Sequence, residues 1–378
     1  MSIVIVAFAV SLALTLFIVR FAKMHSHLTH DHDLSGPQKF HATPVPRVGG
    51  IGIVVGIAAG ALALWFHVPR EAWVAFTLLA CGIPAFGAGL VEDLTKRVSP
   101  RVRLLFTAVS AGLASWALAA TIRHTAIPGL DWVVAMPLGA LVVTVFAVVG
   151  VANSVNIIDG FNGLASMCVV IMLGALAYVG FQVGDSLVGA LALAGIGAVL
   201  GFFLWNYPAG LIFLGDGGAY FLGFFVAELA ILLLARHPGV VSPLFPLLVC
   251  IYPVFETVFS IYRRRILRAV PPSMPDGIHL HSLIYRRVLR WAVGDRSAKA
   301  LTRRNSMTAP YLWMLCMLSV LPATLFWDDT ALVAAFIVLF GVFYVALYWR
   351  IVRFKSPRWL RFGPSRARLA SQADNRRT

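Results

Sequence analysis

The chain has 378 residues, of which 60% are hydrophobic and only 12% are charged. Because soluble globular proteins carry roughly 25% charged residues, this composition excludes an ordinary soluble domain and indicates an integral membrane protein. The formal net charge of +15 would favour a nucleic-acid partner in a soluble protein. In a membrane protein it instead predicts positively charged cytoplasmic loops, and we expect no nucleic-acid binding.

Apolar segments of about 20 residues, the length that spans a bilayer as a helix, recur along the whole chain. The first runs from Ser2 to Val19 and is followed by Arg20 and Lys23, which is typical of an uncleaved span rather than of a signal peptide. We predict an all-α polytopic membrane protein with eleven transmembrane helices, at 2–20, 48–66, 72–90, 104–122, 132–151, 164–182, 186–205, 218–235, 241–262, 308–326 and 330–349.

The basic residues give the orientation of these spans. With the N-terminus outside, the inside segments contain all but three of the 31 Lys and Arg residues, the exceptions being Arg70, Arg123 and Arg236. This bias predicts a cytoplasmic C-terminus and a multi-pass protein of the inner, cytoplasmic membrane. We expect one membrane domain over 1–350 and a basic cytoplasmic tail over 351–378 that contacts anionic lipid.

Polar side chains interrupt the apolar pattern between residues 151 and 164. Asn153, Asn156, Asp159 and Asn162 follow one another at intervals of three. On a helix such residues share a face, so at least the first three are expected to point into one cavity. Oxygen-bearing side chains between two apolar runs predict a site for a hard cation and a polar, phosphorylated ligand.

Two further motifs carry acidic residues. The segment 91–105 places Glu92 and Asp93 at the end of one span and Arg101 and Arg103 at the start of the next. The carboxylates can hold a metal or take a proton, and the arginines can neutralise phosphate, although a charge-balanced loop has the same pattern. The segment 213–223 sets Asp216 among glycines, which suits Mg²⁺ coordination or a simple turn.

Basic and histidine-containing motifs lie on the same side. HATPVPRVGG (41–50) indicates a stiff, closely packed approach to the second span, and DGIHLHSLIYRR (276–287) places His279 and His281 two apart. Histidines near arginines favour diphosphate contact over a transition-metal site or a solvated loop. The tract from His25 to His32 predicts only adventitious metal binding. Glu228 and Glu256, within spans, should face the protein interior.

These motifs fall in five separate loops that the orientation places on the cytoplasmic face. Such convergence predicts one cytoplasmic active site. The alternative is a membrane transporter or a flippase of a lipid-linked or anionic substrate, which would need polar residues near the membrane midplane.

Taken together, the motifs identify the chain as similar to a known family. PxPRxGG, the acidic pair with downstream arginines, NxxNxxDGxNGLA, GDxGxxxLG and DxxHxH, in this order between His41 and Arg304, resemble the polyprenyl-phosphate N-acetylhexosamine-1-phosphate transferases. The resemblance implies an eleven-span phosphotransferase that moves a sugar-1-phosphate from a UDP-sugar to undecaprenyl phosphate and releases UMP, with Mg²⁺ or Mn²⁺ as cofactor.

The resemblance also implies roles for individual residues. Asp216 is the expected principal metal ligand and Asn156 the second. Asp93, with Glu92, is expected to deprotonate or position the lipid phosphate, and Asp216 and Asp159 complete the expected catalytic residues. The expected substrate-binding residues are Lys39, Arg47, Arg101, Arg103, Asn153, Asn162, His279 and His281. Asp159 and Asn162 correspond to the nucleotide side, and the histidines to the diphosphate.

Two departures bear on the substrate. Glu92 stands where the family usually has an aspartate, and Ser282 stands where the branch that uses UDP-GlcNAc often has a third histidine. The histidine-rich motif of the muramoyl-pentapeptide branch is absent. The expected pathway is therefore initiation of a surface polysaccharide, such as the O-antigen of lipopolysaccharide, with GlcNAc-1-phosphate. A homodimer is one arrangement that the sequence allows.

Overall fold

The structure, a computed structural model, describes residues 2–21, 45–267, 278–289 and 297–353. Regular structure in these ranges is helical apart from an isolated bridge at Pro46. Lys39, the tract from His25 to His32 and nearly all of the expected tail lie outside the described residues. The all-α prediction is confirmed for the part of the chain that is described.

The helices follow the expected apolar segments closely. They are α1 (Ser2–Phe21), α3 (Gly49–Trp65), α4 (Pro69–Thr95), α5 (Pro100–Ala117), α6 (Leu130–Val134), α7 (Pro137–Ile158), α8 (Leu164–Gln182), α9 (Ser186–Asn206), α10 (Gly215–Arg236), α11 (Phe245–Val249), α12 (Ile251–Tyr262), α13 (Leu280–Leu283), α14 (Ala298–Leu325) and α15 (Thr330–Val352). Two short π-helices, η2 (Arg263–Leu267) and η3 (Ile284–Val288), follow α12 and α13.

Among the described helices, eight are long and apolar enough to cross a membrane: α1, α4, α7, α8, α9, α10, α14 and α15. The chain is therefore a polytopic membrane protein, as expected. The other three expected spans differ in form. The helix α3 has 17 residues, and α5 carries two arginines in its first turn. The segment 241–262 is divided between α11 and α12.

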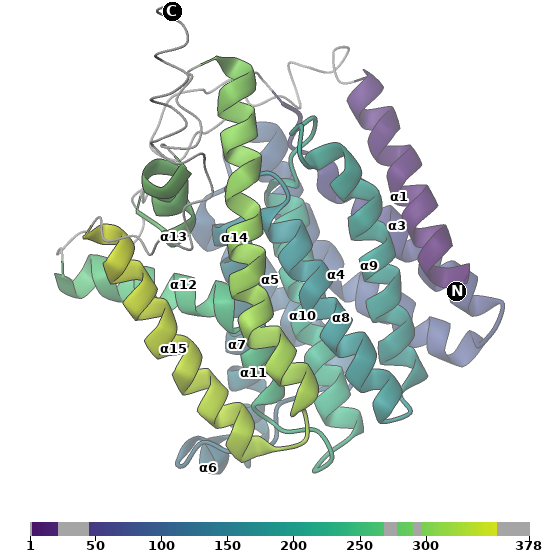
Figure 1. Cartoon of the computed structure of the whole chain (residues 1–378). Coiled ribbons are helices and arrows are strands. Elements are labelled where there is room, and N and C mark those ends of the chain that lie inside the picture. The colour runs from purple at the N-terminus through teal and green to yellow at the C-terminus, as the bar shows by residue number, and fades with distance from the viewer. Residues whose placement is uncertain (1, 22–44, 268–277, 290–296, 354–378) are drawn as a thin grey trace, which may run out of the picture.

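A proline explains the division of 241–262. Pro253 has no N–H for the carbonyl of Val249, and its ring crowds that carbonyl, so the helical hydrogen bonds are interrupted at this point. The chain accordingly leaves helical geometry at Cys250 and resumes it at Ile251. Figure 1 shows α12 running across the bundle rather than along it.

Two helices continue past the ends that hydropathy predicts. The helix α7 begins at Pro137, whose preset φ suits a first helical position, and ends at Ile158 rather than at 151. The helix α4 continues to Thr95 rather than stopping at 90. Asn153, Asn156 and the Glu92–Asp93 pair therefore lie on helix ends, where a rigid backbone sets their positions.

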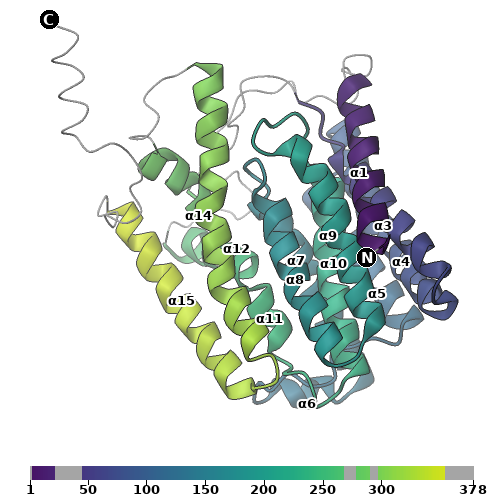
Figure 2. The same ribbon diagram turned by 45° about the vertical axis from the view of Figure 1, so that its right-hand side comes forward.

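The helix α10 is the centre of the bundle, and nearly all of its side chains are buried. It packs against α3, α4, α7 and α8, while α14 and α15 form an antiparallel pair at one side (Figures 1 and 2). On the opposite side, α1, α3 and α9 pack closely through small residues. A Cβ on Gly56 would lie 2.8 Å from the carbonyl oxygen of Ala7, which is the close approach typical of small-residue membrane interfaces.

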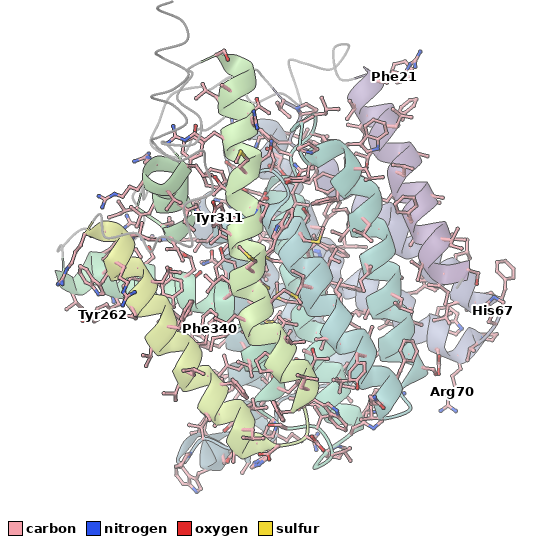
Figure 3. The ribbon with its side chains drawn as sticks, in the orientation of Figure 1. Phe21, His67, Arg70, Tyr262, Tyr311 and Phe340 are labelled. Carbon is pink, nitrogen blue, oxygen red and sulfur yellow. The ribbon has the colours of Figure 1, made fainter. Side chains whose placement is uncertain are left out.

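Three residues mark the two ends of the bundle. Phe21 ends α1 at one end; at the other lie His67, in the connection between α3 and α4, and Arg70, in the first turn of α4 (Figure 3). Glu228 and Glu256 are 0% and 1% exposed, so the prediction that they face the interior is confirmed. All four cysteines are buried and free, as expected for small apolar side chains.

Candidate active site

The N-terminus of α10 is held by the segment that leads into α3. The Phe213 N–H donates to the carbonyl of Pro46 at 2.8 Å, and the Gly49 and Gly50 N–H groups donate to the carbonyls of Phe213 and Leu214, each at 3.0 Å. The residues before Asp216 are therefore fixed by backbone hydrogen bonds to the motif that contains Arg47.

Glycines allow this close approach. A Cβ on Gly50 would lie 2.5 Å from the Cα of Gly218, and a Cβ on Gly89 of α4 would lie 2.5 Å from the N of Gly217. Gly215 has φ +77°, in the left-handed region that favours glycine. The backbones of α3 and α4 thus contact the first turn of α10 directly, and Asp216 lies between them.

Asp93 contacts the start of α10 through its carboxylate. Its Oδ1 accepts from the Asp216 N–H and its Oδ2 from the Gly217 N–H, both at 2.9 Å. Asp93 is 3% exposed. A carboxylate at a helix N-terminus satisfies unpaired N–H groups and complements the helix dipole. Asp93 therefore caps α10 and fixes the backbone of Asp216.

The side chain of Asp216 is the centre of a charged cluster. Arg103 of α5 donates to its Oδ2, and Asn156 Nδ2 of α7 donates to its Oδ1 at 2.9 Å. Arg47 NH2 lies 3.9 Å from the same Oδ1, and Arg47 Nε lies 3.8 Å from Asp93 Oδ1. Residues from three separate segments thus converge on one carboxylate that is 15% exposed.

One face of α7 is turned toward this cluster. Asn153 Oδ1 accepts from the Tyr220 hydroxyl at 3.2 Å, one turn along α10 from Asp216. The guanidinium of Arg103 lies over the Tyr220 ring, 5.6 Å from its centroid. Of the three residues predicted to share a helical face, Asn153 and Asn156 both contact α10.

Asp159 lies where α7 ends. It is the C-terminal capping residue, with φ −77° and ψ 55°, so it has left the helical face of Asn153 and Asn156. Burial raises the pKa of its carboxyl to about 7, and the charge of Arg47 opposes that rise. The effect of Arg47 ties Asp159 electrostatically to the same cluster.

Asn162 does not join the Asp216 cluster. It is 5% exposed, and its Nδ2 donates to the carbonyl of Pro208 at 3.2 Å. Its N–H donates to Asn305 Oδ1 at 2.9 Å. Neighbouring contacts hold the same turn, since the Trp313 indole N–H donates to the Gly163 carbonyl at 3.0 Å. Asn162 therefore anchors the α7–α8 turn to α14.

Two other expected residues lie at the margin of the cluster. Glu92 Oε2 accepts from the Val98 N–H at 2.7 Å, so this side chain holds the α4–α5 connection. Arg101 is exposed in the first turn of α5, whereas Arg103, two residues later, is turned inward. Sequence spacing could not separate these two arginines, because the direction of each depends on how α5 packs.

The two expected histidines form a second group. Their rings are stacked, with centroids 5.1 Å apart, and His279 Nδ1 lies 2.9 Å from Glu256 Oε1. The ring of His281 meets Phe161 edge-on at 5.5 Å. A Cβ on Gly160 would lie 3.4 Å from His281 Nε2. The histidine pair thus contacts the α7–α8 turn beside Asp159.

Two residues in contact with the expected site were not among the sequence candidates. Tyr220 could have been found from its position four residues after Asp216, which places both on one face of a helix. Glu256 had a signal too, because an acidic residue inside an apolar helix is costly unless it has partners. Neither signal identifies the partner, which only the packing of distant helices supplies.

The residues around Asp216 fit a magnesium ion. Within the described ranges no three His, Cys, Asp or Glu side chains gather as a metal-binding group. Mg²⁺ does not need such a group, because it is usually held by one or two carboxylates together with water and substrate phosphates. Asp216 supplies a carboxylate, and Asn156, whose Nδ2 donates to Asp216 Oδ1, also carries an amide oxygen; both are oxygen ligands of the kind that Mg²⁺ prefers.

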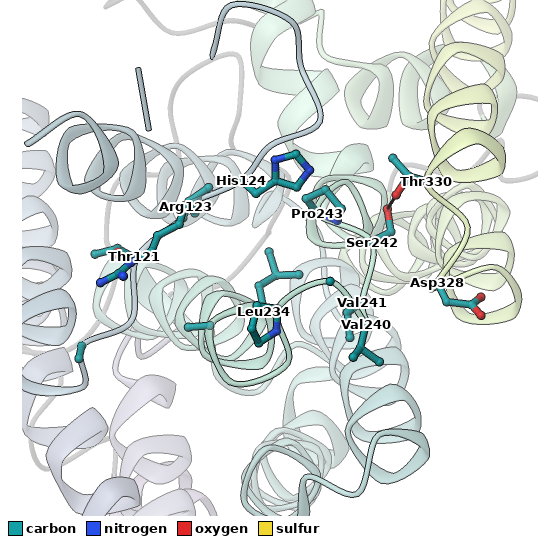
Figure 4. Close-up of a pocket in the computed structure, with 15 residues that line it drawn as sticks. Thr121, Arg123, His124, Leu234, Val240, Val241, Ser242, Pro243, Asp328 and Thr330 are labelled. Carbon is teal, nitrogen blue, oxygen red and sulfur yellow. Dashed lines mark hydrogen bonds between the residues drawn. The ribbon is translucent and has the colours of Figure 1, made fainter. Parts of the chain in front are cut away.

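A cavity of about 550 Å³ lies at the other end of α10 (Figure 4). It is lined by Leu234 and by residues of the α5–α6, α10–α11 and α14–α15 connections, among them Arg123, His124 and Asp328. At 1.5 Å per residue, Leu234 is roughly 27 Å from Asp216 along α10. This cavity is therefore separate from the charged cluster.

Comparison with known proteins identifies the family of this chain. Residues 75–234 match the model of glycosyl transferase family 4. The chain is 32% identical to a probable undecaprenyl-phosphate N-acetylglucosaminyl 1-phosphate transferase of Bacillus subtilis, over 74% of this chain and 76% of the relative. It is 29% identical to an undecaprenyl-phosphate alpha-N-acetylglucosaminyl 1-phosphate transferase of Thermotoga maritima, over 75% and 81%.

A relative from another branch also matches. The chain is 29% identical to a phospho-N-acetylmuramoyl-pentapeptide-transferase of Geobacillus kaustophilus, over 61% of this chain and 75% of the relative. The segment that matches the family model, residues 75–234, contains Asp93, Asn156 and Asp216. The extent of the match to the Bacillus subtilis relative shows that this chain belongs to glycosyl transferase family 4.

Proposed function

We propose that the protein transfers N-acetylglucosamine-1-phosphate from UDP-N-acetylglucosamine to undecaprenyl phosphate and releases UMP. The observation that carries this proposal is the convergence of Arg47, Arg103 and Asn156 on Asp216 at one end of α10. Two relatives that cover most of the chain are named for this transfer to undecaprenyl phosphate.

The transfer exchanges one phosphoanhydride bond for another. An oxygen of undecaprenyl phosphate attacks the β-phosphorus of the UDP-sugar, and the bond from that phosphorus to the bridging oxygen breaks. UMP leaves with the electron pair, and the sugar phosphate becomes part of a lipid-linked diphosphate. A route through a carboxylate–phosphate intermediate is the second candidate, and exchange between UMP and the UDP-sugar without lipid would reveal it.

The chain's own groups stabilise the charge that develops on the phosphates. Arg103 Nε is buried and has no hydrogen-bond partner among the described residues, so it is a donor that a phosphate oxygen can use. Arg47, 25% exposed at its side chain, supplies a second positive charge at the open side. Preorganised donors of this kind lower the barrier to phosphoryl transfer because they need no rearrangement.

The candidate base is Asp159 rather than Asp93. Both oxygens of Asp93 accept backbone N–H groups of α10, which suits a positioning role. Asp159 is partly buried at the end of α7, and burial raises its pKa to about 7, a value that suits a group that takes a proton from the acceptor phosphate near neutral pH. The choice between the two carboxyls rests on the backbone hydrogen bonds of Asp93 and not on this pKa. The sequence prediction assigned this role to Asp93 with Glu92.

A magnesium ion would be held by Asp216 and Asn156. When bound, it supplies positive charge that withdraws electron density from the UDP-sugar diphosphate. The carboxylate of Asp216 is already oriented by the hydrogen bond from Asn156 and by its fixed backbone. These contacts hold the side chains of Asp216 and Asn156 side by side.

The membrane arrangement completes the proposal. Eleven spans, with the N-terminus outside and the basic C-terminus in the cytoplasm, place the Asp216 end of α10 at the cytoplasmic face of the inner membrane, where UDP-sugars are available. Three of these spans depart from a long, wholly apolar helix: α3 is short, α5 carries two arginines, and α11–α12 is divided. A transporter is disfavoured because the charged cluster lies at one end of α10.

The experiment uses purified protein, undecaprenyl phosphate and Mg²⁺, with UDP-GlcNAc and other UDP-N-acetylhexosamines supplied separately. We expect UMP release that requires both the lipid and Mg²⁺ and is fastest with UDP-GlcNAc. Asp216→Asn should lower the rate by about 100-fold or more, the size of effect seen when a group that stabilises the transition state is removed. Asp328→Asn, an exposed carboxylate at the other end of the bundle, is the control. Unchanged turnover in Asp216→Asn would refute the assignment.

A further inference from the structure

Glu256 is a buried carboxylate for which the proposed reaction has no role. It lies in α12 and is 1% exposed, where an ionised carboxylate is costly unless hydrogen bonds satisfy it. Its Oε1 accepts from the Leu280 N–H at 3.1 Å and lies 2.9 Å from His279 Nδ1. Its Oε2 accepts from the Tyr344 hydroxyl of α15 at 2.6 Å. Both oxygens are therefore in use.

The backbone on both sides of His279 is held by the same part of the fold. Arg263 NH1, one residue beyond α12, donates to the carbonyl of Ile278 at 2.6 Å and to the Tyr348 hydroxyl at 2.5 Å. Glu256 holds the Leu280 N–H on the other side. The α12–η2 segment thus fixes the residues before and after His279, and the Glu256 carboxylate contacts the ring as well.

The stacked rings of His279 and His281 connect Glu256 to the proposed active site. His279 stacks on His281 with an interplanar angle of 14°, and His281 lies against Phe161 and Gly160 of the α7–α8 turn. That turn follows Asp159 directly. The carboxylate of Glu256 is therefore linked to the reacting region through the two histidines.

We propose that Glu256 is a positioning residue that acts through His279. The carboxylate accepts a hydrogen bond from Nδ1–H, which selects one tautomer of the imidazole, fixes the ring and directs the Nε2 edge away from α12. A ring fixed in this way suits a histidine that contacts a diphosphate. This inference rests on the proposed function and on the diphosphate contact that the family resemblance implies for His279.

The substitution Glu256→Gln tests the charge without disturbing the packing. A glutamine oxygen can accept from Nδ1–H and from Leu280, and its NH₂ group can donate to the Tyr344 oxygen, so the protein should remain folded. We expect kcat to fall by about 10- to 100-fold, as for other groups that orient a histidine, with KM for UDP-GlcNAc changed by less than about threefold. Tyr344→Phe, which removes the hydrogen bond to Oε2 of the carboxylate, should cost much less.

A double-mutant cycle separates this role from a structural one. If Glu256 acts through His279, Glu256→Gln should cause no further loss in a His279→Ala background. Equal losses in both backgrounds would overturn the proposal. In ¹⁵N spectra of labelled histidine, the His279 ring nitrogens should report Nδ1–H in the wild type, and their shifts should move in Glu256→Gln. The spectrum of an Nε2–H tautomer, or one unchanged by the substitution, would also overturn it.

The ¹⁵N spectrum tests the positioning role of Glu256 without requiring transferase activity. If the folded wild-type protein releases no UMP with any donor, the proposed function fails, while the ¹⁵N shifts still decide whether Glu256 selects the tautomer of His279. If UMP is released and the cycle shows equal losses, the proposed function stands and the positioning role fails.

Discussion

The carboxylate of Asp93 accepts the backbone N–H of Asp216 at 2.9 Å. One acidic residue thereby holds the backbone of a second, 123 residues away in the chain. Because the same carboxylate also accepts the Gly217 N–H, Asp93 caps the first turn of α10. The side chain of Asp216 is then free to meet Arg103 and Asn156.

Asp93→Asn should therefore lower stability as well as activity. An asparagine has one acceptor oxygen, and its NH₂ group would face a backbone donor. The lost cap should cost about 0.5–2 kcal/mol of unfolding free energy. Thermal unfolding in detergent and UMP release measure both effects. A base without a capping role would lose activity at an unchanged melting temperature, and that result would contradict the cap.

Gly89→Ala should separate α4 from α10 and lower transferase activity by about tenfold or more, because added atoms in a packed contact cost about 1–3 kcal/mol. The new Cβ would lie 2.5 Å from the Gly217 backbone. Gly87→Ala on the same helix is the matched control, since a Cβ there meets nothing within 4 Å. Its melting temperature should stay constant or rise. Equal behaviour of the two variants would argue against the close contact.

Tyr220→Phe should weaken activity modestly, because it removes the hydrogen bond to Asn153 but keeps the ring beneath Arg103. A net hydrogen bond is worth about 0.5–1.5 kcal/mol, which corresponds to a rate loss of roughly two- to tenfold. Steady-state UMP release is the measurement. Tyr252→Phe serves as the control, since the buried hydroxyl of Tyr252 has no partner among the described residues, and it should leave the rate unchanged.

The carboxyl of Asp185 should make the free energy of unfolding depend on pH. Burial raises the pKa of its carboxyl, but hydrogen bonds from Arg236, the Val188 N–H and His237 outweigh that effect and hold the pKa below its ordinary value. A lowered pKa in the folded state stabilises the protein above the unfolded pKa of about 3.9. This stabilisation is lost as the pH falls through the folded value.

Thermal unfolding of the wild type and of Asp185→Asn from pH 7 to pH 3 checks this. The wild type should melt at a higher temperature at pH 7, and the difference should shrink below about pH 4. A difference that stays constant across this range would mean that the ion pair with Arg236, at 2.6 Å, does not titrate as described.

Much of the fold could be predicted from hydropathy alone. A backbone in lipid must form its own hydrogen bonds, so long apolar runs become helices wherever they occur, and most of the expected spans lie largely within one helix. The exceptions have local causes. Pro253 interrupts the run 241–262, and polar helix ends such as 152–158 were not assigned to α7 because hydropathy measures apolarity, not helix length.

Some roles of the site residues could likewise be predicted from the sequence, and others could not. The spacing of Asn153 and Asn156 predicted a shared face because helical periodicity is local, and the acids and arginines were recognisable by their cost in an apolar chain. The roles of Asp93 as a cap, of Asn162 as an anchor of a turn and of Glu256 as the partner of His279 depend on contacts between segments far apart in the chain. Sequence determines which residues are chemically able to act. Only the packing of α3, α4 and α7 around α10 decides which of them meet, because it sets the direction of each side chain.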